Sequence, residues 1–240
     1  MLADRAKAMQ RVCFGAEPSE ADLELLGSRE RWLVYRDMVR HRLIQVVGVA
    51  LARTRDAMGA EAFGCAVDEW LSTGGPKTRY LRHVPVELAD FAIPIWMSSD
   101  IPWLAELARF EIACWKVRHA PPEPKPDAEF AFDRTPVLCT AIEVLRLSYP
   151  VHLGPTPAQG YEPSPTLLCV YRDNDHKAST RKLNHLAADL LEAWQRAEET
   201  VADSVQRIAA EHRTELSPAF VEKLSALIAD FIAVGRSSAP

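Results

Sequence analysis

Apolar residues recur every three or four positions through the first half of the chain, as one buried face of a helix requires. The longest such stretch predicts a single amphipathic helix over residues 31–58, which Gly59 can end. Ser19 is a suitable N-cap for an earlier helix, because Asp22 follows three residues later. Further helices are expected over 61–71, 86–97 with a bend at Pro94, and 102–119 with Pro102 in the first turn.

The pattern changes after a proline-rich stretch, Ala120–Asp127. Its four prolines suit neither a helix interior nor a central strand, so the stretch is predicted to be a linker. Beyond it, short β-rich segments come first and amphipathic segments follow. Strands are expected over 142–151, 167–172 and 178–183, with a hairpin turn at 173–176. Helices are expected over 186–199 with Asn184 as N-cap, over 201–212, and from Ser217–Pro218 onward.

These patterns predict an α+β chain in two parts. The first, residues 1–119, is an all-helical lobe. The linker occupies 120–127. The second part, 128–240, is a small antiparallel sheet with three helices, in a winged-helix-like arrangement.

Composition restricts the function classes. The chain has 240 residues, 48% of them hydrophobic, which is enough for a buried core. Its formal net charge of −5 argues against broad nucleic-acid binding. The five cysteines are scattered, which indicates a reducing compartment and thiols used mostly as small core residues. Without a signal-like start, and with no apolar run long enough to span a bilayer, the chain is expected to be cytoplasmic.

The sequence offers little catalytic chemistry. No two of the seven histidines are four residues apart, and no His/Cys pattern has zinc spacing. Asp173–Asp175 is similar to the start of a calcium loop, but Ala178 stands where that loop requires glycine. Nucleotide-binding glycine motifs and the Gly-x-Ser-x-Gly motif are absent. We therefore predict no catalytic residue, no intrinsic metal site and no cofactor in this chain.

The predicted sheet suggests a function because its third strand has an open edge. An extended peptide can add to such an edge through main-chain hydrogen bonds, while the last helix forms the other wall of a groove. Part of the apolar stripe on that helix must instead be ordinary core. The predicted peptide-binding site consists of Ala178, Ser179, Thr180, Arg181, Lys182, Leu183, Phe220, Leu224, Leu227 and Phe231.

The same region resembles a known peptide-binding element. Ala178–Asn184, followed by Leu190–Leu191 and two later helices, resembles the precursor-peptide recognition element (RRE) of PqqD type. That resemblance covers about residues 140–235 and implies binding of a ribosomally made precursor peptide. The glycine expected after the first helix of the element is replaced by residues 196–199, Arg-Ala-Glu-Glu, which predicts longer or nearly continuous helices.

A second resemblance covers residues 28–185. Tyr35–Arg36, 101–111, 147–151 and 170–173, taken in this order, are similar to the HvfC/BufC family, which includes the methanobactin biosynthesis protein MbnC. Members of that family are implied to be non-catalytic partners of a multinuclear non-haem iron-dependent oxidative enzyme (MNIO). The iron then belongs to the partner, an α/β barrel that oxidises residues of the peptide. The resemblance implies a heterodimer, with an interface expected to include Tyr35, Arg36, Trp103, Arg109 and Glu111.

Two other functions compete with this interpretation. A winged-helix fold also suits a DNA-binding regulator, whose last helix would enter the major groove. That helix region carries Glu222 and Asp230 beside only Lys223 and Arg236, a balance that suits a protein partner better than phosphates. A stand-alone enzyme is the third possibility, and the shortage of catalytic motifs argues against it.

Overall fold

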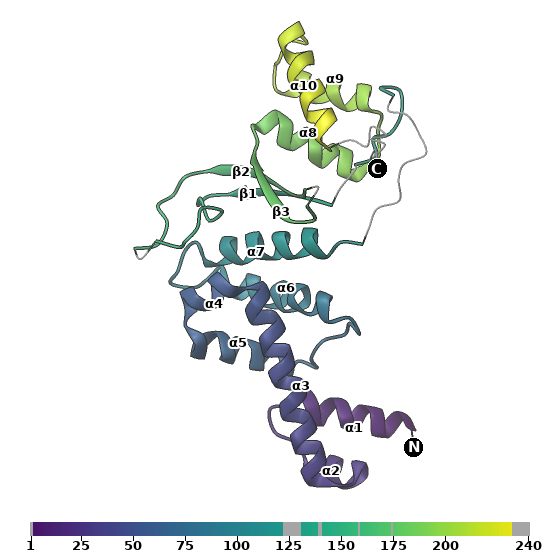
Figure 1. The fold of residues 1–240 in the computed structure, drawn as a ribbon, viewed down its shortest axis with the longest axis vertical. Coiled ribbons are helices and arrows are strands. Elements are labelled where there is room, and N and C mark those ends of the chain that lie inside the picture. The colour runs from purple at the N-terminus through teal and green to yellow at the C-terminus, as the bar shows by residue number, and fades with distance from the viewer. Residues whose placement is uncertain (1, 122–130, 139–140, 158, 174, 232–240) are drawn as a thin grey trace. The chain divides into compact units, whose positions relative to one another are not determined.

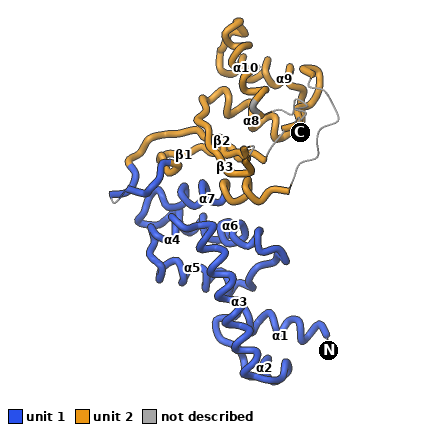
Figure 2. Tube along the Cα trace, viewed as in Figure 1, with its two compact units in different colours: residues 1–112, 153–161 blue, residues 113–152, 162–240 orange. Residues whose placement is uncertain are grey.

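The structure, a computed structural model, describes residues 2–121, 131–138, 141–157, 159–173 and 175–231. It is α+β with a helical N-terminal part, which confirms the predicted fold class. The chain divides into two compact units, Met1–Ile112 with Leu153–Tyr161, and Ala113–His152 with Glu162–Pro240 (Figure 2). The division after Ile112 falls inside a helix, earlier than the predicted linker, most of which lies outside the described residues.

The first unit is built from helices joined by short connections (Figure 1). Ser19 caps the second helix as predicted, because its Oγ accepts a hydrogen bond from the Asp22 N–H at 3.1 Å. The first helix was not predicted from the sequence. The elements are α1 (Leu2–Phe14), α2 (Glu20–Leu26), α3 (Arg29–Ala50), α4 (Ala52–Met58), α5 (Ala60–Ser72), the short 3-10 helix η1 (Leu81–His83), α6 (Val84–Trp96) and α7 (Leu104–His119).

The single helix predicted over 31–58 is wrong, because the chain breaks between α3 and α4. Leu51 leaves the helical region, with φ −118° and ψ 44°. The Glu111 carboxylate accepts hydrogen bonds from the backbone N–H groups of Arg53 and Thr54, each at 2.9 Å. It thereby supplies acceptors for donors that the break leaves free. The apolar spacing continues across Leu51, so periodicity alone could not reveal the interruption.

Two tryptophans of the first unit belong to its core. Trp70 and Trp96 are buried, and the Trp96 ring lies 6.5 Å from that of Phe63. They pack with apolar side chains from α3, α5, α6 and α7, among them Val47 and Leu88. These two tryptophans therefore stabilise the helical unit itself.

In the second unit a three-stranded antiparallel sheet is followed by three helices (Figure 1). The strands lie in the order β1 (Ile142–Leu147), β2 (Thr166–Arg172) and β3 (Ala178–Lys182). Their helices are α8 (His185–Arg196), α9 (Val201–Glu211) and α10 (Pro218–Phe231). Asn184 caps α8 as predicted, since its Oδ1 accepts from the Ala187 N–H at 2.8 Å.

One core joins the sheet to all three helices. Cys169 of β2 and Trp194 of α8 are buried in it, together with Ile208 of α9 and Phe231 of α10. The Trp194 indole N–H donates to the buried Ser204 hydroxyl at 2.9 Å, so its polar atom is satisfied inside the core.

The expectation of nearly continuous helices after residue 196 is also wrong. Ala197 ends α8 in the left-handed conformation, with φ 53° and ψ 37°, and its N–H bonds to the Ala193 carbonyl. Thr200 then caps α9 through a hydrogen bond from the Asp203 N–H at 3.1 Å. The chain makes the helix end that usually takes glycine, but with an alanine.

This alanine gives a stability prediction. A left-handed alanine costs roughly 1–2 kcal/mol relative to an ordinary conformation, and glycine removes most of that strain. Ala197→Gly should therefore stabilise the protein by about 1 kcal/mol, measured by chemical denaturation. Gln206→Gly, at an exposed position within α9, is the matched control and should destabilise by about 1 kcal/mol. An Ala197→Gly variant as destabilised as this control would contradict the assigned helix end.

Candidate functional site

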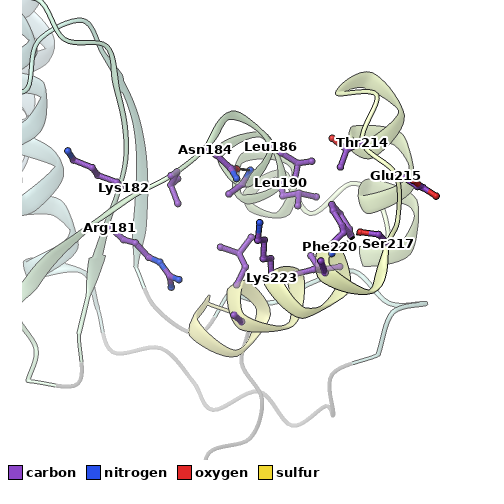
Figure 3. A pocket seen from close by; sticks show the side chains of 16 residues that line it. Arg181, Lys182, Asn184, Leu186, Leu190, Thr214, Glu215, Ser217, Phe220 and Lys223 are labelled. Atoms are coloured by element: carbon purple, nitrogen blue, oxygen red, sulfur yellow. Dashed lines mark hydrogen bonds between the residues drawn. The ribbon is translucent and has the colours of Figure 1, made fainter.

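A groove of about 500 Å³ opens in the second unit between the end of β3, α8, the α9–α10 connection and α10 (Figure 3). Its walls are mostly apolar side chains from α8 and α10. The groove is lined by Arg181, Lys182, Leu183, Asn184, Leu186, Ala187, Leu190, Thr214, Glu215, Ser217, Ala219, Phe220, Lys223, Leu224, Ala226 and Leu227.

The structure brings six of the ten predicted peptide-site residues to this groove. Three lie at the end of β3 and beyond it, and three on α10. Ala178, Ser179 and Thr180 lie earlier on β3, and Phe231 is buried with its ring 5.3 Å from that of Tyr171. The six lining residues are Arg181, Lys182, Leu183, Phe220, Leu224 and Leu227.

The register of β3 fixes which backbone groups remain available. Leu183 N–H donates to the Leu167 carbonyl, and Asp173 N–H to the Lys177 carbonyl, each at 2.9 Å. Because hydrogen-bonded pairs alternate along an antiparallel ladder, odd-numbered residues 177–183 direct their N–H and C=O groups toward β2. The even-numbered residues 178–182 direct theirs away from it. Since β3 is an edge of the three-stranded sheet, these groups face the open side.

The walls of the groove combine core and surface. Leu190, Leu224 and Leu227 are buried and belong to the core of the unit, so much of the α10 stripe is structural, as expected from the sequence. Phe220 and Leu186 are only partly buried at the same place. Partly exposed apolar groups above a fixed core form a surface that an apolar side chain can cover.

Positive charge lies beside this apolar surface. Arg181 of β3 and Lys223 of α10 extend toward the groove, while the amine of Lys182 points away from it (Figure 3). The Arg181 guanidinium lies 5.8 Å from the centre of the Phe231 ring, a cation–π contact. Glu215 is the one acidic residue of the lining. An acidic ligand is therefore favoured over a basic one.

An ionic cluster holds α8, the end of α9 and β1 together. The Asp189 carboxylate is 2.6 Å from His212 Nε2 and also pairs with Arg146, which contacts Glu192 as well. Burial raises the pKa of Asp189, but the hydrogen bonds from His212 and Arg146 outweigh it, and the net pKa is lowered. His212 ends α9 two residues before Thr214, so the cluster fixes the connection that closes one end of the groove.

The predicted partner-interface residues have varied surroundings in the first unit. Arg36 donates to backbone carbonyls at the end of α1, including that of Val12. Glu111 caps α4, and the Trp103 ring lies 5.3 Å from that of Tyr161. Two of the five, Tyr35 on α3 and Arg109 on α7, are exposed.

Within the described residues, no three His, Cys, Asp or Glu side chains gather as metal ligands would. Nor is any helix in that part of the chain long and apolar enough to cross a membrane. Burial raises the pKa of the Cys169 thiol to about 12, which agrees with a core role. Cys13 is buried too, but Cys65 is exposed, so the expectation of core cysteines holds only in part.

Sequence reasoning missed the contribution of α8 and of the α9–α10 connection. Leu186 and Leu190 carry a visible signal, an apolar stripe at helical spacing, but such a stripe is equally typical of the core face of a helix. Lys223 was considered only as one charge on the last helix. Nothing local in the sequence places Thr214 or Glu215 at a groove, because their position depends on the packing of α9 and α10.

Comparison with known proteins adds one finding. Residues 140–232 match the HvfC C-terminal domain. The match contains all three strands and helices α8 to α10, and therefore every residue that lines the groove. This part of the chain is thus similar to the HvfC C-terminal domain, which agrees with the predicted resemblance to the HvfC/BufC family. Among curated proteins, no match was found.

The ionic cluster yields a prediction about pH. Because folding lowers the pKa of Asp189, its stabilising effect is present above the unfolded value of about 3.9 and is lost as the pH falls through the folded value. Asp189→Asn should lower the urea midpoint at neutral pH and make stability fall less steeply on acidification. Asp133→Asn, at an exposed position, is the control and should leave both unchanged. Equal acid sensitivity of Asp189→Asn and the parent would refute the role assigned to this carboxylate.

Proposed function

We propose that this chain is a non-catalytic partner that binds the leader of a ribosomally made precursor peptide and presents it to an MNIO iron oxidase. The observation that supports it most is the groove beside the open edge of β3, in the region similar to the HvfC C-terminal domain. The iron resides in the partner, and this chain contributes recognition. The HvfC similarity favours this function over a DNA-binding regulator.

The leader adds as a strand along β3. Ala178, Thr180 and Lys182 offer N–H and C=O groups on the open side, which an extended peptide can pair with. Side chains of an extended peptide alternate between two faces, so every second one points toward the helices. Those side chains contact Phe220 and Leu186, while carboxylates of the leader pair with Lys223 or Arg181. Backbone bonds and apolar contacts hold the peptide, and charge accelerates its encounter.

The iron enzyme docks on the helical unit in this proposal. Three apolar side chains on α3 are largely exposed, Val34 and Met38 at 63% each and Val49 at 71%. At 100° per residue they lie within one face of α3, and Tyr35 lies beside them. Val34 and Met38, one turn apart, form a short exposed apolar stripe beside Tyr35, and His41 and Gln45 separate this stripe from Val49 on the same face. Exposed apolar groups of this kind are candidates for a protein interface.

Proline substitutions test the strand addition. Thr180→Pro removes an N–H that faces the open side, so it should weaken leader binding roughly three- to tenfold, the worth of one backbone hydrogen bond, without unfolding the sheet. Affinity is measured by fluorescence anisotropy with a labelled leader peptide. Circular dichroism confirms that the variant is folded.

The neighbouring residue is the matched control. Arg181→Pro removes a donor of the β2–β3 ladder, so it should reduce the thermal stability of the protein itself. Tight leader binding by a folded Thr180→Pro variant would mean that the peptide does not add at this edge.

Co-purification tests the partner interface. Met38→Glu places a charge in the exposed stripe of α3 and should reduce recovery of the co-expressed iron enzyme about tenfold or more, because a buried unpaired charge is costly at an interface. Glu24→Lys, an exposed change on α2, is the control and should leave recovery unchanged. Full recovery with Met38→Glu would exclude α3 from the interface.

A further inference from the structure

A second surface outside the groove has the composition of a docking site. The connection from α5 to α6 contains the segment Lys77–His83, called the basic loop below (Figure 1). It reads Lys-Thr-Arg-Tyr-Leu-Arg-His, and every residue except Thr78 is exposed. Two of the exposed residues are large and apolar, Tyr80 at 46% and Leu81 at 43% exposure.

The basic loop has a net charge opposite in sign to that of the rest of the protein. Lys77, Arg79 and Arg82 give it a charge of +3, with no acidic residue. Since the whole chain carries a formal net charge of −5, the remainder carries −8. Among the described residues, no salt bridge involves the side chain of Lys77 or Arg79. The charges of Lys77 and Arg79 are therefore left for an external anion.

The backbone of the basic loop is held in place. Glu87, in the first turn of α6, accepts hydrogen bonds from the N–H groups of Lys77 at 2.7 Å and Thr78 at 2.8 Å. The Thr78 hydroxyl in turn accepts from the Tyr80 N–H at 3.1 Å. The carboxylate of Glu87 thus anchors the chain through backbone donors. A fixed backbone lowers the conformational entropy that a partner must overcome on binding.

Tyr80 lies at the centre of the cationic groups. The guanidinium carbons of Arg79 and Arg82 are 5.0 and 5.4 Å from the centre of its ring, and the His83 ring is 5.6 Å away. A guanidinium over an aromatic face keeps in-plane N–H donors for a carboxylate. The positive charges of Arg79 and Arg82 repel each other across one exposed ring. Neither arginine side chain takes part in the hydrogen bonds that hold the backbone of the loop, so folding of the loop does not require these charges. Exposed Tyr and Arg are also the residue types most enriched among interface anchors.

We propose that the basic loop docks an acidic segment of a protein partner. Lys77 and Arg79 pair with carboxylates of that segment, and an aliphatic side chain between those carboxylates covers Tyr80 and Leu81. A nucleic acid fits less well, because tight phosphate binding commonly uses about six to ten contacts and the loop offers three formal charges. The charge of −8 on the remaining residues also repels a long polyanion.

The test uses the full chain and a short fluorescein-labelled peptide of alternating glutamate and leucine, with a glutamine–leucine peptide as its neutral counterpart. Anisotropy should show binding of the acidic peptide at low salt, at least tenfold tighter than that of the neutral one. Arg79→Glu should weaken the acidic peptide at least roughly tenfold, and Tyr80→Ala severalfold. Arg79→Gln serves as a milder variant if charge reversal disturbs the fold.

Two control variants distinguish binding at the basic loop from binding elsewhere on the protein. Arg42→Glu makes the same charge change at an exposed position on α3, and Lys223→Glu removes a cation of the groove. Arg42→Glu should bind the acidic peptide within about twofold of the parent. In the Lys223→Glu background, where the groove has lost a cation, Arg79→Glu should still weaken the acidic peptide at least roughly tenfold. Loss with Lys223→Glu but not Arg79→Glu would place the peptide in the groove and overturn the proposal. So would equal loss with Arg42→Glu, equal binding of the neutral peptide, or tighter binding of a labelled oligothymidine.

Discussion

The packing of α8, α9 and α10 against one face of the small sheet is the constraint on which the candidate site depends. Cys169, Trp194 and Phe231 are buried in a single core, so the sheet and the three helices cannot shift independently. That core fixes the spacing between β3 and α10, and the groove lies above it. The Asp189 cluster adds a polar connection at the surface, where α9 turns toward α10. The walls of the groove are therefore preorganised for a ligand.

In the helical unit, one polar side chain fixes the position of one helix relative to another. Glu111 of α7 accepts three hydrogen bonds at the start of α4, two from backbone N–H groups and one from the Thr54 hydroxyl at 2.7 Å. Thr54 is fully buried, so these bonds satisfy groups that would otherwise be costly to bury. This residue was predicted at a partner interface because of a family resemblance. Its contacts show a structural role, and a loss of partner binding on mutation would have to be separated from a loss of folding.

How far the sequence could predict the fold depended on whether the signal was local. Caps such as Ser19 and Asn184 form within three residues, and both were correct. The break at Leu51 is stabilised by Glu111, about sixty residues away in sequence, so no local pattern could show it. Ala197 adopts a left-handed conformation that alanine disfavours, so the residue type gives no local signal that a helix ends there. Residues of β3 and α10 could be named as a site, but the groove also needed α8 and the α9–α10 connection.

In β3, successive residues alternate in the direction of their backbone groups and of their side chains, so neighbouring residues make different contacts. The backbone N–H and C=O groups of Arg181 face β2, while its side chain lies at the groove and over the Phe231 ring. Thr180 does the reverse, because its backbone groups face the open edge and its side chain points to the other face of the sheet. A ligand that adds at this edge would therefore obtain its main-chain bonds from the even-numbered residues of β3, and its contact with a β3 side chain on the helix side from Arg181. Side-chain substitutions on β3 would then change selectivity while leaving strand addition intact, so the same edge could serve peptides of different sequence.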